Sequence, residues 1–152
     1  MVAVLDPAGL SDRAIADELV RRRAEIDRLE AEFAQLAWTG HQRGIGAADG
    51  SPSTQAWLRK HTGMREGDAK GAIEAGRVSE LLPKVGAAWR DGTITGGAAK
   101  TITAARVDGH DLKLRALEDL FLDLAVANDT RELRRACAHF RDCRSRRRNL
   151  PA

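Results

Sequence analysis

Residues 11–40 read SDRAIADELVRRRAEIDRLEAEFAQLAWTG, and this stretch decides the fold. Its large apolar side chains recur at alternating intervals of three and four residues, with Arg22 in the one position that breaks the series. They are Ile15, Leu19, Ile26, Leu29, Phe33 and Leu36. This heptad spacing predicts a helix from about residue 12 to 38, with Ser11 as its N-cap.

The apolar stripe of this helix has two interpretations. It packs onto other helices of the same chain, or it forms a coiled-coil dimer. Fewer than four heptads and an Arg on the seam favour packing within the chain, and dimerisation through residues 12–38 is the alternative.

A loop is predicted over residues 39–53, TGHQRGIGAADGSPS, which contain four Gly and one Pro without periodicity. Gly40 and Gly44 are expected to end the long helix. A loop of this length without secondary structure is the best candidate in the chain for a flexible or functional segment.

Six shorter helical segments follow, at about 55–62, 65–81, 83–91, 96–105, 111–124 and 129–143. Their expected start signals are Thr54, Pro83, Thr95, Asp111 and the capping box Asp129–Glu132. Gly67, Gly71 and Gly76 in the second segment leave places where another backbone could approach closely. No stretch alternates like a strand. We therefore predict an all-α fold, a long heptad-patterned helix packed on a bundle of about five to six shorter ones.

The length of 152 residues suits one domain, predicted at 1–143 and followed by a basic tail at 144–152. The formal net charge of +3 conceals an uneven distribution. Residues 131–148 hold eight Arg against Glu132 and Asp142, a local charge of +6, whereas the other residues number 17 basic and 20 acidic. Such a segregated basic segment has three interpretations: a nucleic-acid contact, a solvated helix end, or a linker to a further part of a protein.

Composition excludes several classes of protein. No apolar run reaches the roughly 18 residues of a membrane span, and the N-terminus has no secretory pattern. Two Cys are too few for a disulfide framework, so we predict a cytoplasmic protein without a membrane partner.

Catalytic and metal-binding patterns are weak throughout. In Cys137-x-His139-x3-Cys143 one helix cannot direct all three side chains at one ion, and Asp108-Gly-His110-Asp111 is typical of a turn before a helix. Gly96-Gly-Ala-Ala-Lys100-Thr101 lacks the Gly before Lys and the preceding strand of a phosphate loop. We predict no enzyme activity, no metal site and no cofactor.

A helix–turn–helix is a further hypothesis for residues 54–81, joined through Thr62-Gly63-Met64. Leu58, Met64, Ala69 and Ile73 would supply its packing positions. Against it, Arg59 is large where the helices should cross, and residues 65–70 mix positive and negative charges.

Three motifs resemble a known family: Ser53-Thr-Gln-Ala-Trp-Leu-Arg-Lys-His-Thr-Gly-Met64 followed by Leu81-Leu-Pro83, Ala88-Trp-Arg-Asp-Gly-Thr-Ile-Thr95, and Asn128-Asp-Thr-Arg-Glu-Leu-Arg-Arg135. In order and spacing they resemble domain of unknown function 222, an actinobacterial and phage family that commonly precedes an HNH endonuclease domain. The resemblance covers most of the chain and implies an all-helical module linked to DNA metabolism or mobile elements. The paired His and Asn of an HNH centre are missing, so we expect no nuclease activity.

The leading functional expectation is a non-catalytic accessory module that binds DNA weakly and non-specifically. Its predicted phosphate contacts are Arg131, Arg134, Arg135, Arg141, Arg144, Arg146, Arg147 and Arg148. The alternative is a protein-interaction or dimerisation module, or a truncated remnant, with no nucleic-acid binding of its own.

Overall fold

The structure is a computed structural model that describes residues 5–148, with side chains as far as Arg146. Its elements are η1 (Pro7–Gly9), α1 (Asp12–Arg43), η2 (Ile45–Asp49), α2 (Thr54–Thr62), α3 (Glu66–Leu81), α4 (Pro83–Asp91), α5 (Gly96–Thr103), α6 (Asp111–Ala116), α7 (Glu118–Val126) and α8 (Thr130–Arg148). These described residues contain no strand, so the predicted all-α fold is confirmed. No helix among them is long and apolar enough to cross a lipid bilayer.

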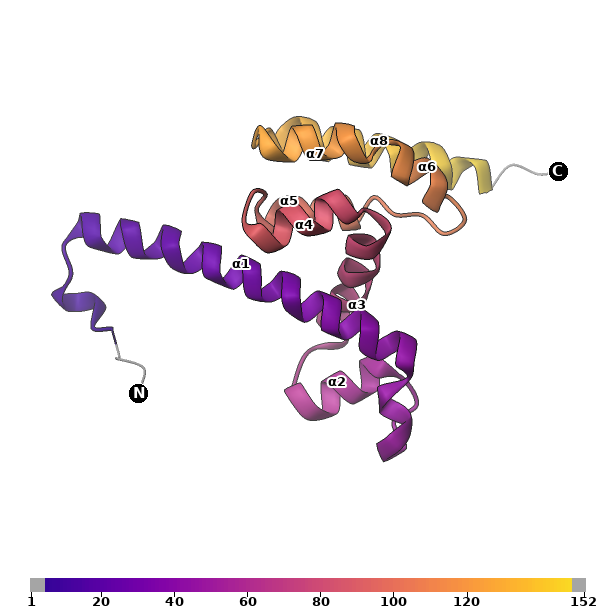
Figure 1. Ribbon diagram of the computed structural model, residues 1–152, viewed down its shortest axis with the longest axis horizontal. Coiled ribbons are helices and arrows are strands. Elements are labelled where there is room, and N and C mark those ends of the chain that lie inside the picture. Colours follow the sequence, from indigo (N-terminus) through magenta and orange to yellow (C-terminus); the bar gives the residue numbers. More distant parts are fainter. Residues whose placement is uncertain (1–4, 149–152) are drawn as a thin grey trace.

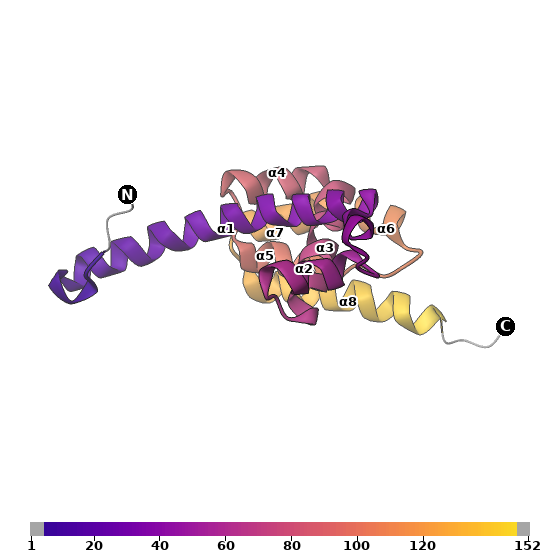
Figure 2. The ribbon, with the colours of Figure 1, turned by 90° about the horizontal axis from the view of Figure 1, so that it is seen from below.

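The helices stack in layers across the long axis of the molecule (Figure 1). α7 and α8 pack against each other in one layer, and α4 and α5 form the next. α1 crosses beneath them and packs chiefly on α3, which descends to α2. Figure 2 shows that the N-terminal half of α1 extends away from this body, whereas the end of α8 lies at the opposite end of the molecule.

One continuous core joins α1, α3, α4, α5 and the α6–α8 segment. Its largest fully buried side chains are Leu82, Ile102, Leu114, Phe121, Leu133 and Val78. A smaller cluster of Ala37, Leu58, Ala69 and Ile73 joins the end of α1 to α2 and α3. The second cluster contains three of the four packing positions proposed for the helix–turn–helix, with Met64 packed at its edge.

The face of α1 that packs on the body is not the predicted one. Its buried residues are Asp27, Ala31, Ala34, Ala37 and Gly40. The heptad stripe instead remains exposed at Leu19, Ile26, Leu29, Phe33 and Leu36. The expectation that this stripe packs within the chain is therefore wrong, because small residues on another face allow a closer approach of the helices.

At Gly76 the backbones of α1 and α3 approach each other closely. A Cβ atom built on Gly76 would lie 2.0 Å from the carbonyl oxygen of Ala34. The predicted close approach is thus found at Gly76 but not at Gly67 or Gly71, where such an atom would meet nothing within 4 Å.

The predicted loop at 39–53 is partly helical. α1 continues to Arg43 and ends at Gly44, whose φ of 64° is left-handed, and η2 then occupies Ile45–Asp49. Gly40 does not end the helix, because it is buried against Ile45 inside the helical packing.

Most predicted start and stop signals are found. Ser11 and Thr95 accept hydrogen bonds from the amides three residues on, at 3.2 and 3.1 Å. Pro83 occupies the first turn of α4. At α2 the N-cap is Ser53 rather than Thr54, because the Ser53 hydroxyl accepts from the Ala56 amide and Thr54 is buried.

Two helix boundaries near the C-terminus differ from the sequence analysis. The single helix expected at 111–124 is divided at Leu117 into α6 and α7, and Glu118 turns its carboxylate towards the start of α4. Its Oε1 accepts hydrogen bonds from the amides of Lys84 and Val85 at 2.7 and 3.2 Å. α8 passes through the expected boundary at 143 to Arg148, so residues 144–148 of the predicted tail are helical, and 149–152 lie outside the described residues.

Candidate nucleic-acid interface

α8, the Arg-rich helix, is fixed to the body along one face. Asp129 begins it, accepting a 3.0 Å hydrogen bond from the Glu132 amide. Leu133, Cys137 and Phe140 are buried, and the Phe140 ring meets that of Phe121 edge to face at 6.4 Å. Because the helix contributes to the core, its remaining faces are presented in fixed directions.

The predicted phosphate-binding residues occupy different faces of α8. Arg134 and Arg141 lie seven residues apart and therefore share one exposed face. Arg131, Arg135 and Arg146 share a neighbouring exposed face. Arg147 and Arg148 lie in the helix, but their side chains are outside the described part of the structure.

Arg144 differs from the other predicted contacts. It is half-buried, and its guanidinium carbon lies 5.4 Å from the centre of the Phe140 ring. This cation–π contact holds the guanidinium over the Phe140 ring, so Arg144 is less available to an external anion than the exposed arginines. Arg144 therefore has a structural role in this helix.

Ion pairs engage some of these arginines within the helix. Arg135 pairs with Glu132 at 2.9 Å, and Arg141 approaches Asp142 only to 3.9 Å. Arg131 and Arg134 have no acidic partner among the described residues. The exposed Arg146 likewise has no acidic partner among the described residues, so Arg131, Arg134, Arg141 and Arg146 are the predicted contacts most available to an external anion.

Arg141 also lines a cleft of about 500 Å³ between α8, α3 and the end of α1. Sequence reasoning missed the basic residues that face it from elsewhere in the chain, because only the fold brings them to α8. They are His41, Lys70, Arg77 and Arg106, with Glu74 and Asp108 as the acidic residues of the same cleft.

Two of these basic residues have internal partners. The guanidinium of Arg77 stacks over the Trp38 ring at 4.8 Å. Arg106, only 9% exposed, pairs with Glu74, Asp108 and Asp111 at 2.7, 3.0 and 3.0 Å. Burial disfavours its charge, but the Glu74 and Asp111 contacts outweigh burial and raise the pKa of Arg106. Arg77 also lies 3.6 Å from Glu74. Lys70 and Arg141 therefore remain as the cations of the cleft without a close internal partner.

The segment predicted as a loop brings together a Ser, a His and an Asp. Asp49 accepts from the Ser51 hydroxyl at 2.6 Å and lies 2.6 Å from His61 Nε2. In a catalytic triad the His lies between nucleophile and acid, whereas here the carboxylate lies between them. The Ser51 hydroxyl donates to the carboxylate and not to the imidazole, so the arrangement differs from a catalytic triad and joins η2 to α2.

The cysteines of α8 lie in different surroundings. Cys137 is buried, and burial raises the pKa of its thiol to about 11. Cys143 is exposed, with its Sγ 3.6 Å from His139 Nε2. Among the described residues no group of three His, Cys, Asp or Glu side chains could hold a metal ion.

The α2–α3 pair has the turn glycine of the proposed helix–turn–helix, with Gly63 at a φ of 72°. The first turn of α3 carries Glu66 and Asp68, and Arg65 pairs with Asp68 at 3.0 Å. An acidic start is unfavourable for entering a groove lined by phosphates. The basic face of α8 is the better candidate.

Comparison of the chain with family models, with curated proteins and with solved structures finds no match. The resemblance to domain of unknown function 222 therefore stays a prediction.

Proposed function

We propose that the chain is a non-catalytic helical module that binds nucleic acid through the Arg134–Arg141 face of α8. The observation that carries this proposal is the placing of these two exposed arginines on one face, beside a cleft rimmed by Lys70 and Arg77. Cationic side chains held on a rigid helix contact phosphates without reading the base sequence. A role beside DNA-processing enzymes, as the family resemblance implies, is part of the same proposal.

The expected binding mode is electrostatic. Removal of one phosphate-binding cation makes the slope of log affinity against log salt concentration shallower by about 0.9 for duplex DNA. Deleting α8 would not be a clean test, because Leu133, Cys137 and Phe140 belong to the core. Point substitutions at exposed arginines leave that core intact.

The test is fluorescence anisotropy with labelled duplex DNA at several salt concentrations. The variant Arg134→Ala/Arg141→Ala should bind more weakly, with a salt slope shallower by about 1.8. The control Arg28→Ala/Arg115→Ala removes two exposed arginines elsewhere and changes the net charge equally. Equal affinity and slope for the two double variants would refute the proposal, as would a wild-type chain that does not bind.

Protein interaction is the second candidate function, favoured by a different observation. The heptad stripe of α1 is apolar and exposed along both the projecting and the packed half of the helix. Contiguous apolar surface of this kind marks an interaction site.

A further inference from the structure

The fold leaves the apolar stripe of α1 exposed among the described residues. The exposed fractions are 67% for Leu19, 45% for Ile26, 59% for Leu29, 37% for Phe33 and 72% for Leu36. These residues follow the 3–4 spacing of a coiled coil without interruption except at Arg22. Folding of the single chain leaves them exposed, because the body packs on another face of α1. That face consists of Asp27, Ala31, Ala34, Ala37 and Gly40.

Half of this helix has no support from the body. Residues 12–26 contain no buried side chain, and Figure 2 shows this half extending away from the other helices. Isolated helices of about 12–15 residues are marginal in water, and ion pairs such as Glu18–Arg22 add little. A projecting helix with an apolar stripe is therefore incomplete as a monomer.

We propose that the stripe is the seam of an antiparallel coiled-coil dimer formed with a second copy of this chain. An antiparallel pair places residues 12–26 of each chain against residues 29–43 of the other. The projecting half of each α1 then packs on the half of the second copy's α1 that the second copy's own body supports. Across the seam Leu19 faces Leu36 of the second copy, and Ile26 faces Leu29 of the second copy.

Arg22 determines the orientation. In a parallel dimer the two copies of Arg22 would face each other in the seam, where like charges repel and desolvation is costly. In the antiparallel register Arg22 faces Phe33 of the second copy, so that the guanidinium lies against an aromatic ring. Arg22 therefore disfavours a parallel seam, whereas the antiparallel seam accommodates both copies of Arg22.

The flanking charges do not oppose this choice. In the antiparallel register Arg23 faces Glu30 of the second copy, which is attractive, and Glu25 faces Glu32 of the second copy, which is repulsive. A parallel seam has the same balance, with Glu18 facing Arg23 of the second copy and Glu25 facing Glu30 of the second copy. Since the flanks are equal, the contact of Arg22 decides between the two orientations.

Sedimentation velocity of the full chain over a range of concentrations tests the proposal. The wild type should be a dimer, and Leu29→Glu should raise the dimer dissociation constant at least about a hundredfold, because each dimer loses two buried leucines. Leu112→Glu is the matched control, since Leu112 is 80% exposed on α6 and lies outside the stripe. Circular dichroism establishes that each variant is folded.

A wild-type monomer over the whole range would overturn the proposal and would assign the stripe to a different partner. A dimer that Leu29→Glu leaves unchanged would overturn it equally. Orientation is tested in a Cys143→Ser background, which removes the exposed native thiol. A mixture of Leu19→Cys and Leu36→Cys chains should form a disulfide-linked dimer, and efficient cross-linking of Leu19→Cys chains to each other would overturn the antiparallel arrangement.

Discussion

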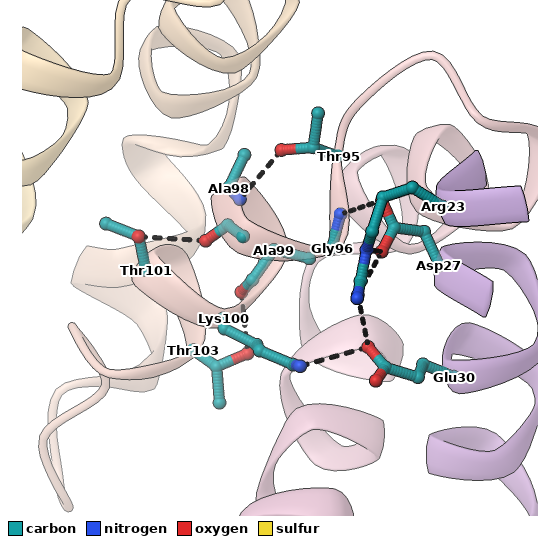
Figure 3. A network of polar contacts seen from close by, with 11 residues as sticks. Arg23, Asp27, Glu30, Thr95, Gly96, Ala98, Ala99, Lys100, Thr101 and Thr103 are labelled. Carbon is teal, nitrogen blue, oxygen red and sulfur yellow. Dashed lines mark hydrogen bonds and ion pairs between the residues drawn. The ribbon is translucent and has the colours of Figure 1, made fainter. Parts of the chain in front are cut away.

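Asp27 on α1 accepts a hydrogen bond from the backbone amide of Gly96, the first residue of α5, at 3.0 Å (Figure 3). The two residues are 69 positions apart in the chain. The other carboxylate oxygen of Asp27 accepts from Arg23 at 2.6 Å. The buried carboxylate thus satisfies an otherwise free amide at a helix start and fixes α5 against α1.

Substitution of Asp27 tests this contact. Asp27→Ala leaves the Gly96 amide without an acceptor, and we expect a loss of about 1–3 kcal/mol in the free energy of unfolding. Asp27→Asn keeps an oxygen that can accept from the amide, so its loss should be smaller. Urea denaturation measures both, and Asp17→Ala, an exposed aspartate on the same helix, is the control. Equal stability of Asp27→Ala and the control would contradict this role.

The glycines of α3 provide a pair of opposite predictions. Gly76→Ala places a methyl group in the space of the Ala34 carbonyl oxygen, so α1 and α3 must separate, and we expect a loss of about 3 kcal/mol. Gly71→Ala meets open space on an exposed helix face and should gain about 1 kcal/mol from helix propensity. The two urea midpoints should therefore move in opposite directions, and a shift of both in one direction would refute the close approach.

The sequence predicted the positions of the helices better than it predicted which of their faces are buried. Heptad spacing predicted a long helix at 12–38, and Ser11, Thr95 and Gly63 act as caps because capping depends on local chemistry. The buried face was missed because counting large apolar residues overlooks Ala31, Ala34 and Gly40. Small side chains bury little area each, but they permit the close helix contact seen at Gly76.

Only part of the candidate interface could be predicted. The arginine run at 131–148 is visible as a local excess of charge, and the 3.6-residue period places Arg134 and Arg141 on one face. Lys70 and Arg77 join Arg141 through packing of α3 against the rest of the fold, and no spacing in the sequence encodes that proximity. The inward turn of Arg144 likewise depends on its contact with Phe140.

The two cysteines should differ in reactivity. Cys143 is exposed and should react quickly with Ellman's reagent near neutral pH. Burial raises the pKa of Cys137 to about 11, so its thiolate is scarce and its sulfur inaccessible in the folded chain. We expect one thiol per chain to react under native conditions and the second only in denaturant. Two thiols that react at the same native rate would show that α8 does not pack as described.

Asp49 should make the stability of the η2–α2 contact depend on acid pH. The hydrogen bonds from Ser51 and His61 and the charge of Lys60 hold the pKa of Asp49 well below its ordinary value. A group whose pKa is lowered by folding stabilises the fold above its unfolded pKa of about 3.9, and this contribution disappears as the pH falls towards the folded value.

Thermal melts of the wild type and Asp49→Asn test this dependence. The wild type should melt at a higher temperature near pH 6, because the charged carboxylate holds Ser51 and His61 together. The difference should decrease below about pH 4, where the unfolded carboxylate takes up a proton more readily than the folded one. Asp17→Asn is the control, since Asp17 has no ion-pair partner among residues 5–148. A wild-type advantage that stays constant down to pH 3 would contradict the lowered pKa.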